Sequence, residues 1–256
     1  MIHPDLASLI VVMVKICAPI CAISGKSSFA HSRNIFYIWS NASSKMQLQL
    51  KKLINPALFI ALAFFCMLMG EITLRYIPFS PTASFLQIKQ TEAQELPYYL
   101  PVFYIHVYAS MFCLLAGFTQ FNRRILQRKK TLHRRAGYLY IITVLFLSAP
   151  TGFIMGLHAN GGWIAIIFFA MLAWLWFWFT FRAVTAVRQK NFLAHREYMI
   201  RSYALALSAI TLRLWKVVLV YFFQPAPMDL YVIIAGLGWI PNLLIAEFII
   251  YKLKKQ

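Results

Sequence analysis

The chain has 256 residues, of which 61% are hydrophobic and only 12% charged, and its formal net charge is +18. Several apolar runs reach the roughly 20 residues that an α-helix needs to cross a bilayer, so the composition indicates a multi-pass membrane protein. The basic residues lie in the gaps between these runs and leave no soluble domain for binding nucleic acid. The sequence also lacks the Walker loop, HExxH and dinucleotide motifs that would favour a kinase or a hydrolase.

Residues 1–45 differ in composition from the rest of the chain. They begin with an apolar segment broken by Lys15 and Pro19 and continue into a polar, serine-rich stretch. Two interpretations stay open, namely an extra amino-terminal hydrophobic span and an extension that precedes a natural start at Met46. We therefore expect an amino-terminal extension over 1–45 and a single six-helix membrane domain over 46–256.

Hydropathy predicts six core spans joined by short loops, which gives an all-α, polytopic transmembrane helical bundle. The expected spans cover residues 54–77, 100–121, 136–157, 163–181, 202–223 and 230–251. The loop after the second span contains no acid and seven basic residues, which are Arg123, Arg124, Arg128, Lys129, Lys130, Arg134 and Arg135. Such loops stay cytoplasmic, so we expect a bacterial inner-membrane protein with both core termini in the cytoplasm.

The second span carries a stripe of small and polar residues at helical spacing. His106, Ser110, Cys113, Gly117 and Gln120 fall on one face of a helix. Such residues in a membrane helix face protein, because lipid offers polar groups no partner. This stripe is therefore expected to pack inside the bundle.

The third and fourth spans carry further packing signals. Pro150 and the GxxxG pair of Gly152 and Gly156 predict a kink or a close helix approach in the third span. The fourth span is the most apolar and contains the run WLWFWFTF. Its aromatic rings are expected to meet lipid or neighbouring rings.

Several motifs between residues 106 and 250 resemble a known family. They are HVYAS, AGFTQF, LHRRAGYLY, HANGG, AHREYMIRSYALALSAITLRLW and WIPNLLIAEF. Together they are similar to the bacterial predicted membrane proteins of domain of unknown function 2306. The resemblance leaves out the first 45 residues and favours Met46 as the start of the core. It implies a membrane protein without a particular activity, and a loose grouping of that family with two-haem membrane cytochromes adds modest weight to haem binding.

Histidines near the ends of the predicted spans are candidate haem ligands. A membrane b-type haem is usually held by two histidines from different helices, one on each side of the iron. His133 and His195 precede the third and fifth spans on the cytoplasmic side, whereas His106 and His158 lie towards the other side. The cytoplasmic pair is better placed, because the adjacent second and third spans lie awkwardly close for a haem between them. The alternatives for His133 and His195 are anchoring at lipid headgroups beside their arginines, and another metal or proton role.

Charged residues within apolar spans give a second signal. Arg213, Lys216, Glu71 and Glu247 lie where an ionised side chain costs a few kcal/mol and therefore needs a partner or a function. Structural ion pairs are one explanation, with Glu71 pairing with Arg75 or with Arg213. Haem-propionate contacts by Arg213 and Lys216, and a proton path through the glutamates, are the functional alternatives.

The hypothesis from the sequence is electron transfer through haem b in the lipid bilayer. Its cofactor-binding residues are His133, His195, His106, His158 and Arg213, with His133 and His195 as ligands of the iron. A quinone or another membrane protein would be the redox partner. The alternative is a transporter or a small-ligand-binding membrane protein without haem, and the sequence does not decide whether the protein is an enzyme.

Overall fold

The computed structural model describes residues 60–77, 79–120 and 128–255. Contacts divide the chain into two units, residues 1–62 and 63–256, and all described residues except 60–62 belong to the second. The expectations for an amino-terminal extension and for a start at Met46 lie outside the described residues.

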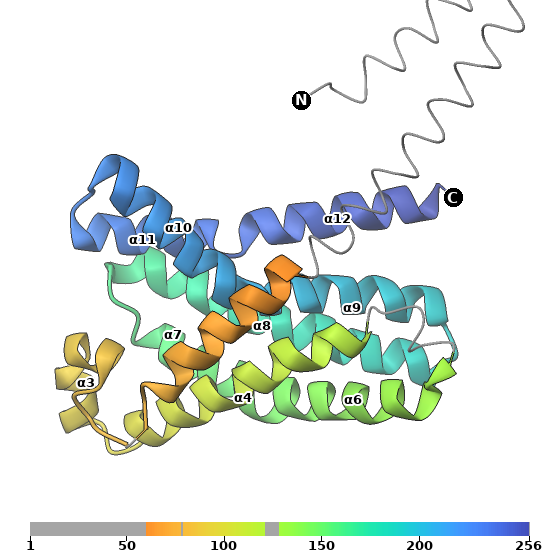
Figure 1. The fold of residues 1–256 in the computed structure, drawn as a ribbon, viewed down its shortest axis with the longest axis horizontal. Coiled ribbons are helices and arrows are strands. Elements are labelled where there is room, and N and C mark those ends of the chain that lie inside the picture. Colours follow the sequence, from red (N-terminus) through yellow and green to blue (C-terminus); the bar gives the residue numbers. More distant parts are fainter. Residues whose placement is uncertain (1–59, 78, 121–127, 256) are drawn as a thin grey trace, which may run out of the picture. The chain divides into compact units, whose positions relative to one another are not determined.

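The described secondary structure is entirely helical (Figure 1). A short apolar helix, Ile60–Leu74, is followed by η1 (Ser84–Ile88), α3 (Gln90–Glu95), α4 (Tyr99–Gln120), α6 (Lys130–Ile142), the π-helical η2 (Thr143–Ser148), α7 (Ala149–Leu157), α8 (Gly162–Arg188), α9 (Phe192–Ala206), α10 (Ser208–Phe223), α11 (Pro227–Leu237) and α12 (Ile240–Lys254). Within the described residues, five stretches are long and apolar enough to cross a membrane, namely Tyr99–Gly117, Lys130–Leu157, Gly162–Arg188, Phe192–Phe223 and Pro227–Lys254. The prediction of an all-α protein with several membrane spans is confirmed by these five stretches and the shorter apolar helix Ile60–Leu74.

Two helices begin well before the predicted spans. α6 starts at Lys130 and α9 at Phe192, whereas hydropathy placed the span starts at residues 136 and 202. Hydropathy marks only the part of a helix that suits lipid, and basic side chains are good helix formers outside it. As a result, His133 and His195 each lie one turn inside a helix.

α8 is the central helix of the bundle. Its most extensive contacts are with α9 and α7, and α11 also packs on it. α4 contacts α6, η2 and α7, while α12 contacts α9. Figure 1 shows α4 alongside α6 and α12 alongside α9. This packing brings the starts of α6 and α9 to the same end of the bundle as the carboxyl end of α8.

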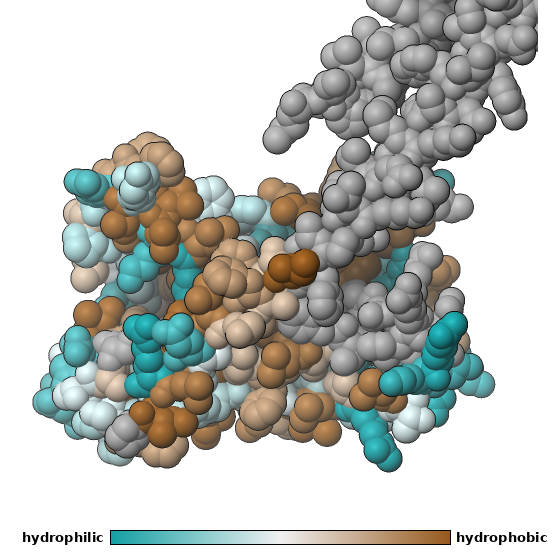
Figure 2. Space-filling model, in the orientation of Figure 1, coloured by the Kyte–Doolittle hydropathy of each residue, from teal (hydrophilic) through white to brown (hydrophobic). Residues whose placement is uncertain are grey.

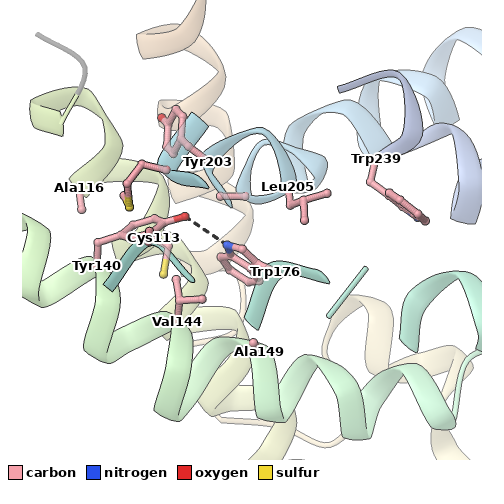
Figure 3. Close-up of a cluster of buried hydrophobic side chains, with 12 residues drawn as sticks. Cys113, Ala116, Tyr140, Val144, Ala149, Trp176, Tyr203, Leu205 and Trp239 are labelled. Atoms are coloured by element: carbon pink, nitrogen blue, oxygen red, sulfur yellow. Dashed lines mark hydrogen bonds between the residues drawn. The ribbon is translucent and has the colours of Figure 1, made fainter. Parts of the chain in front are cut away.

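A buried core joins α4, α6, α8 and α9 (Figure 3). It comprises Cys113, Ala116, Tyr140, Val144, Ala149, Trp176, Ala183, Met199, Tyr203, Leu205, Ala206 and Trp239. Several polar groups in this region are paired with one another. Trp176 Nε1–H donates to the Tyr140 hydroxyl at 3.2 Å, and the Tyr140 and Thr180 hydroxyls each lie 2.7 Å from Ser202 Oγ. Because buried polar groups are costly without partners, these bonds favour one packing of α6, α8 and α9.

The small residues predicted to face protein do so. Cys113 and Gly117 are buried, and a Cβ at Gly117 would come within 1.8 Å of Tyr203 Cε2. A Cβ at Gly156 would lie 3.2 Å from the backbone of Phe169, so this glycine allows α7 to approach α8 closely. The predicted packing of the stripe and the close approach at the GxxxG pair are confirmed.

Exposed aromatic side chains lie along α8, as the fourth span predicted. Trp163, Trp174, Trp178 and Phe181 have exposed fractions of 41% or more, and the Trp174 ring stacks on that of Trp178. Figure 2 shows extensive hydrophobic surface on the face in view. Apolar surface of this extent suits contact with lipid.

Candidate functional site

We call one end of the bundle the basic end. It is formed by the first turns of α6 and α9 and the last turn of α8, and its exposed cations include Arg134, Arg135, Arg188, Lys190 and Arg196. Two of the candidate histidines, His133 and His195, lie here in the first turns of α6 and α9.

The start of α9 sets the position of His195. Lys190 has a positive φ of 59°, and Asn191 Oδ1 accepts the backbone N–H of Ala194 at 3.0 Å, which caps the helix. His195 Nδ1 then lies 2.9 Å from the carbonyl oxygen of Ala183 on α8. A carbonyl can only accept, so Nδ1 carries the proton, and Nε2 stays outside this hydrogen bond.

His133 occupies the matching position on α6. Its carbonyl oxygen accepts a hydrogen bond from Gln120 Nε2 of α4 at 3.1 Å. Its Nδ1 is buried and has no hydrogen-bond partner in the part of the chain that the structure describes. His133 lies close enough to His195 for the charges of the two rings to interact. The structure therefore places the two residues that the sequence singled out at the same end of the bundle, in the first turns of α6 and α9.

This histidine pair can supply one imidazole from each of two helices. A haem iron with two axial histidines requires such an arrangement. Within the described residues, no group of three or more His, Cys, Asp and Glu side chains is placed to hold a metal ion.

Glu247 takes part in an ion-pair network near the basic end. Arg201 on α9 contacts both oxygens of Glu247 on α12, at 2.5 and 2.8 Å, and Lys254 Nζ lies 3.1 Å from Glu197. Glu247 therefore has an ion-pair partner, Arg201. A two-point arginine–carboxylate pair fastens α12 to α9, which is the structural explanation of the Glu247 charge within an apolar span.

His106 lies beside the irregular part of the third span. Its Nδ1–H donates to the carbonyl oxygen of Ser148 at 2.9 Å, at the end of the π-helical segment Thr143–Ser148. Gly152 makes room for the ring, because a Cβ there would lie 2.8 Å from His106 Cε1. No hydrogen bond reaches His106 Nε2 from the described residues, and Arg213 is close enough to act electrostatically on the ring. His106 on α4 therefore lies against a π-helical turn, a feature that is often found at functional sites.

His158 has both ring nitrogens engaged. Its Nδ1–H donates to the carbonyl oxygen of Ile154 at 3.0 Å, and its Nε2 lies 3.3 Å from the Tyr98 hydroxyl. This arrangement fixes the ring at the end of α7. His158 consequently offers no free nitrogen for a ligand in this structure.

Lys89 is a buried residue whose importance the sequence analysis missed. It is 1% exposed, and its ammonium group donates to the Glu92 carboxylate, the Asn160 side-chain oxygen and the His158 carbonyl. Burial alone would raise the pKa of Glu92. The hydrogen bonds from Lys89 and the backbone, with the positive charges of Lys89 and His158, lower the pKa instead. This cluster ties the segment before α4 to the turn between α7 and α8.

A bundle of five long apolar helices with paired histidines at its basic end defines a multi-pass α-helical membrane protein with a candidate ligand site. Residues 103–250, more than half of the chain, match the family described as predicted membrane protein, DUF2306, and the chain belongs to this family. The match contains all four candidate histidines and Arg213, and it confirms the resemblance found in the sequence. Neither the curated proteins nor the solved structures gave a match.

Proposed function

We propose that the protein binds haem b between His133 and His195 and transfers electrons within the membrane. The observation that carries this proposal is that the two histidines lie at the same end of the bundle, in the first turns of α6 and α9, where the charge of one ring acts on the other. His195 is held by the Ala183 carbonyl with its Nε2 lone pair available. An imidazole oriented through its other nitrogen in this way is typical of metal-binding histidines.

Two features of the surroundings support the same ligand. The buried Nδ1 of His133 lacks a partner among the described residues, and a buried polar atom of this kind is satisfied when a ligand binds to it. Arg134, Arg135 and Arg196 supply exposed positive charge close to both histidines, which suits the two propionates of a haem. When bound, haem supplies one-electron chemistry, for which a quinone or another membrane protein would be the partner.

The absorbance spectrum of the purified protein tests this proposal. The full chain is produced with ample haem and purified in detergent, and a reduced-minus-oxidised spectrum is recorded. We expect the low-spin signature of two-histidine ligation. His106→Ala then distinguishes one haem from two. If a second haem is bound at His106 and Arg213, this substitution removes it and halves the haem content. A colourless parent protein contradicts the proposal and leaves a haem-free transporter or ligand-binding protein as the leading account.

We also propose that the helix Ile60–Leu74 belongs to a sixth span and that the basic end faces the cytoplasm of a bacterial inner membrane. The concentration of arginine and lysine at that end supports this orientation. Reporter fusions after Arg128 and Arg188 should behave as cytoplasmic, and fusions after Glu95 and Asp229 as external. An external result at Arg128 would overturn the orientation, because its loop carries the strongest charge bias.

A further inference from the structure

A cavity of about 600 Å³ lies between α10 and the end of the helix Ile60–Leu74. Three cations contribute to its wall, together with apolar and aromatic side chains. The residues that matter for its chemistry are Arg75, Arg213, Lys216, Val217, Val220 and Tyr221. This cavity lies apart from the histidine pair, which belongs to the first turns of α6 and α9.

Only one of the three cations has a carboxylate partner among the described residues. Arg75 pairs with Glu71 at 2.6 Å, as the sequence suggested. Arg213 donates to the carbonyl oxygen of Ala209 in its own helix at 2.7 Å, and within the described ranges neither Arg213 nor Lys216 forms an ion pair. An ionised side chain in a membrane span costs a few kcal/mol unless it is paired or solvated. The cavity therefore offers two positive charges to an anion.

The position of the cavity on α10 suits a ligand that enters from the end of the helix. Arg213, Lys216, Val217 and Val220 repeat at helical spacing and share one face. α10 ends at Phe223, so Arg213 lies about 15 Å from that end by helical rise. Arg213 reaches back along α10 to the Ala209 carbonyl, whereas Lys216 lies three residues closer to Phe223 and has a long stem that allows its charged group to reach towards the polar boundary. Val217 is 67% exposed and Val220 is 44% exposed, so apolar surface flanks the charges.

We propose that this cavity binds an oxyanion, a phosphate or a carboxylate, and that its ligand is the headgroup of an anionic lipid. A guanidinium group can hold two oxygens of such an anion, and the ammonium group of Lys216 can hold a third. The acyl chains of a lipid would run from these charges towards the middle of the bilayer, past Ile72, which precedes Arg75 along the chain and also lines the cavity, a contact that a free ion does not use. Charge and apolar surface together therefore favour a lipid over a free anion.

Delipidated full-length protein in a neutral detergent tests this assignment with phosphatidylglycerol. Phosphatidylcholine and inorganic phosphate serve as comparison ligands at constant ionic strength. Binding is measured by native mass spectrometry and by the rise in Tm. We expect saturable binding of phosphatidylglycerol and none of phosphatidylcholine. Arg213→Gln and Lys216→Gln should each weaken it about tenfold or more, because each removes a charge-assisted hydrogen bond.

Two further variants make the test specific. Lys252→Gln removes an exposed cation that lies 4.4 Å from the Phe248 ring on α12, and this control should bind like the parent. Arg213→Lys keeps the charge but not the two-point geometry, so its binding should be intermediate. Equal binding of inorganic phosphate overturns the lipid and leaves a free oxyanion as the ligand. If folded Arg213→Gln and Lys216→Gln bind phosphatidylglycerol as tightly as the parent does, the site itself is wrong.

Discussion

The ring of Tyr203 on α9 fills the space beside Gly117 on α4, where a Cβ would come within 1.8 Å of Tyr203 Cε2. The Tyr203 hydroxyl donates to the carbonyl oxygen of Leu114 at 3.2 Å, which also holds the ring against α4. α9 carries His195 in its first turn. The position of the histidine pair therefore depends on a contact deeper in the bundle.

Gly117→Ala should destabilise the protein, because the buried ring has to move to admit the methyl group. Overpacking of this kind costs about 1–3 kcal/mol and should appear as a lower Tm in detergent. Gly70→Ala is the matched control, since its Cβ would lie 3.5 Å from Met111 Cε in ordinary contact. Equal Tm values for the two variants would contradict the close approach of Tyr203.

Tyr140→Phe should also lower Tm, by an amount that corresponds to about 0.5–1.5 kcal/mol. The substitution removes the acceptor of the Trp176 Nε1–H and one partner of Ser202. Tyr138→Phe is the control, because Tyr138 is 66% exposed on the same helix. A loss of stability that is the same in both variants would show that the buried hydroxyl contributes nothing specific.

Hydropathy predicted most of the fold, because every helix that crosses lipid needs a run of about 20 mostly apolar residues. The helical spacing of small and polar residues also predicted correctly that the stripe on α4 faces protein, because lipid offers such residues no favourable contact. Hydropathy could not find the starts of α6 and α9. Their first turns lie in basic sequence, where a helix and a loop have the same low hydropathy and cannot be distinguished by it.

The candidate site was predicted in part. The sequence favoured His133 and His195 over the other histidines, and the structure places both in first turns at the same end of the bundle. His158 was included because of its position alone, and nothing in the sequence showed that Ile154 and Tyr98 would engage both of its nitrogens. The burial of Lys89 depends on contacts with residues about 70 positions later in the chain, which no local pattern reveals.

Acidic pH should weaken the cluster that holds the segment before α4 against the turn between α7 and α8, because it protonates Glu92, the partner of Lys89. The folded state lowers the pKa of Glu92 below its ordinary value of 4.5, so folding favours the charged carboxylate. Its stabilisation is fully present above that ordinary value and is lost as the pH falls below it. The parent should therefore have a higher Tm than Glu92→Gln at neutral pH, and the difference should shrink as the pH falls below 4.5. A difference that stays constant with pH would show that the charge of Glu92 is not what stabilises this cluster.

The haem content of matched histidine variants is the most direct test of whether His133 and His195 hold a haem. Reduced-minus-oxidised spectra are recorded for the parent, His133→Ala, His195→Ala and His158→Ala, all produced with ample haem and compared at equal protein concentration. The account predicts a low-spin spectrum in the parent and in His158→Ala, and its loss in each of the other two, because an iron with two axial histidines does not stay low-spin with one ligand removed. A parent protein without haem, or full low-spin spectra in both His133→Ala and His195→Ala, would contradict it.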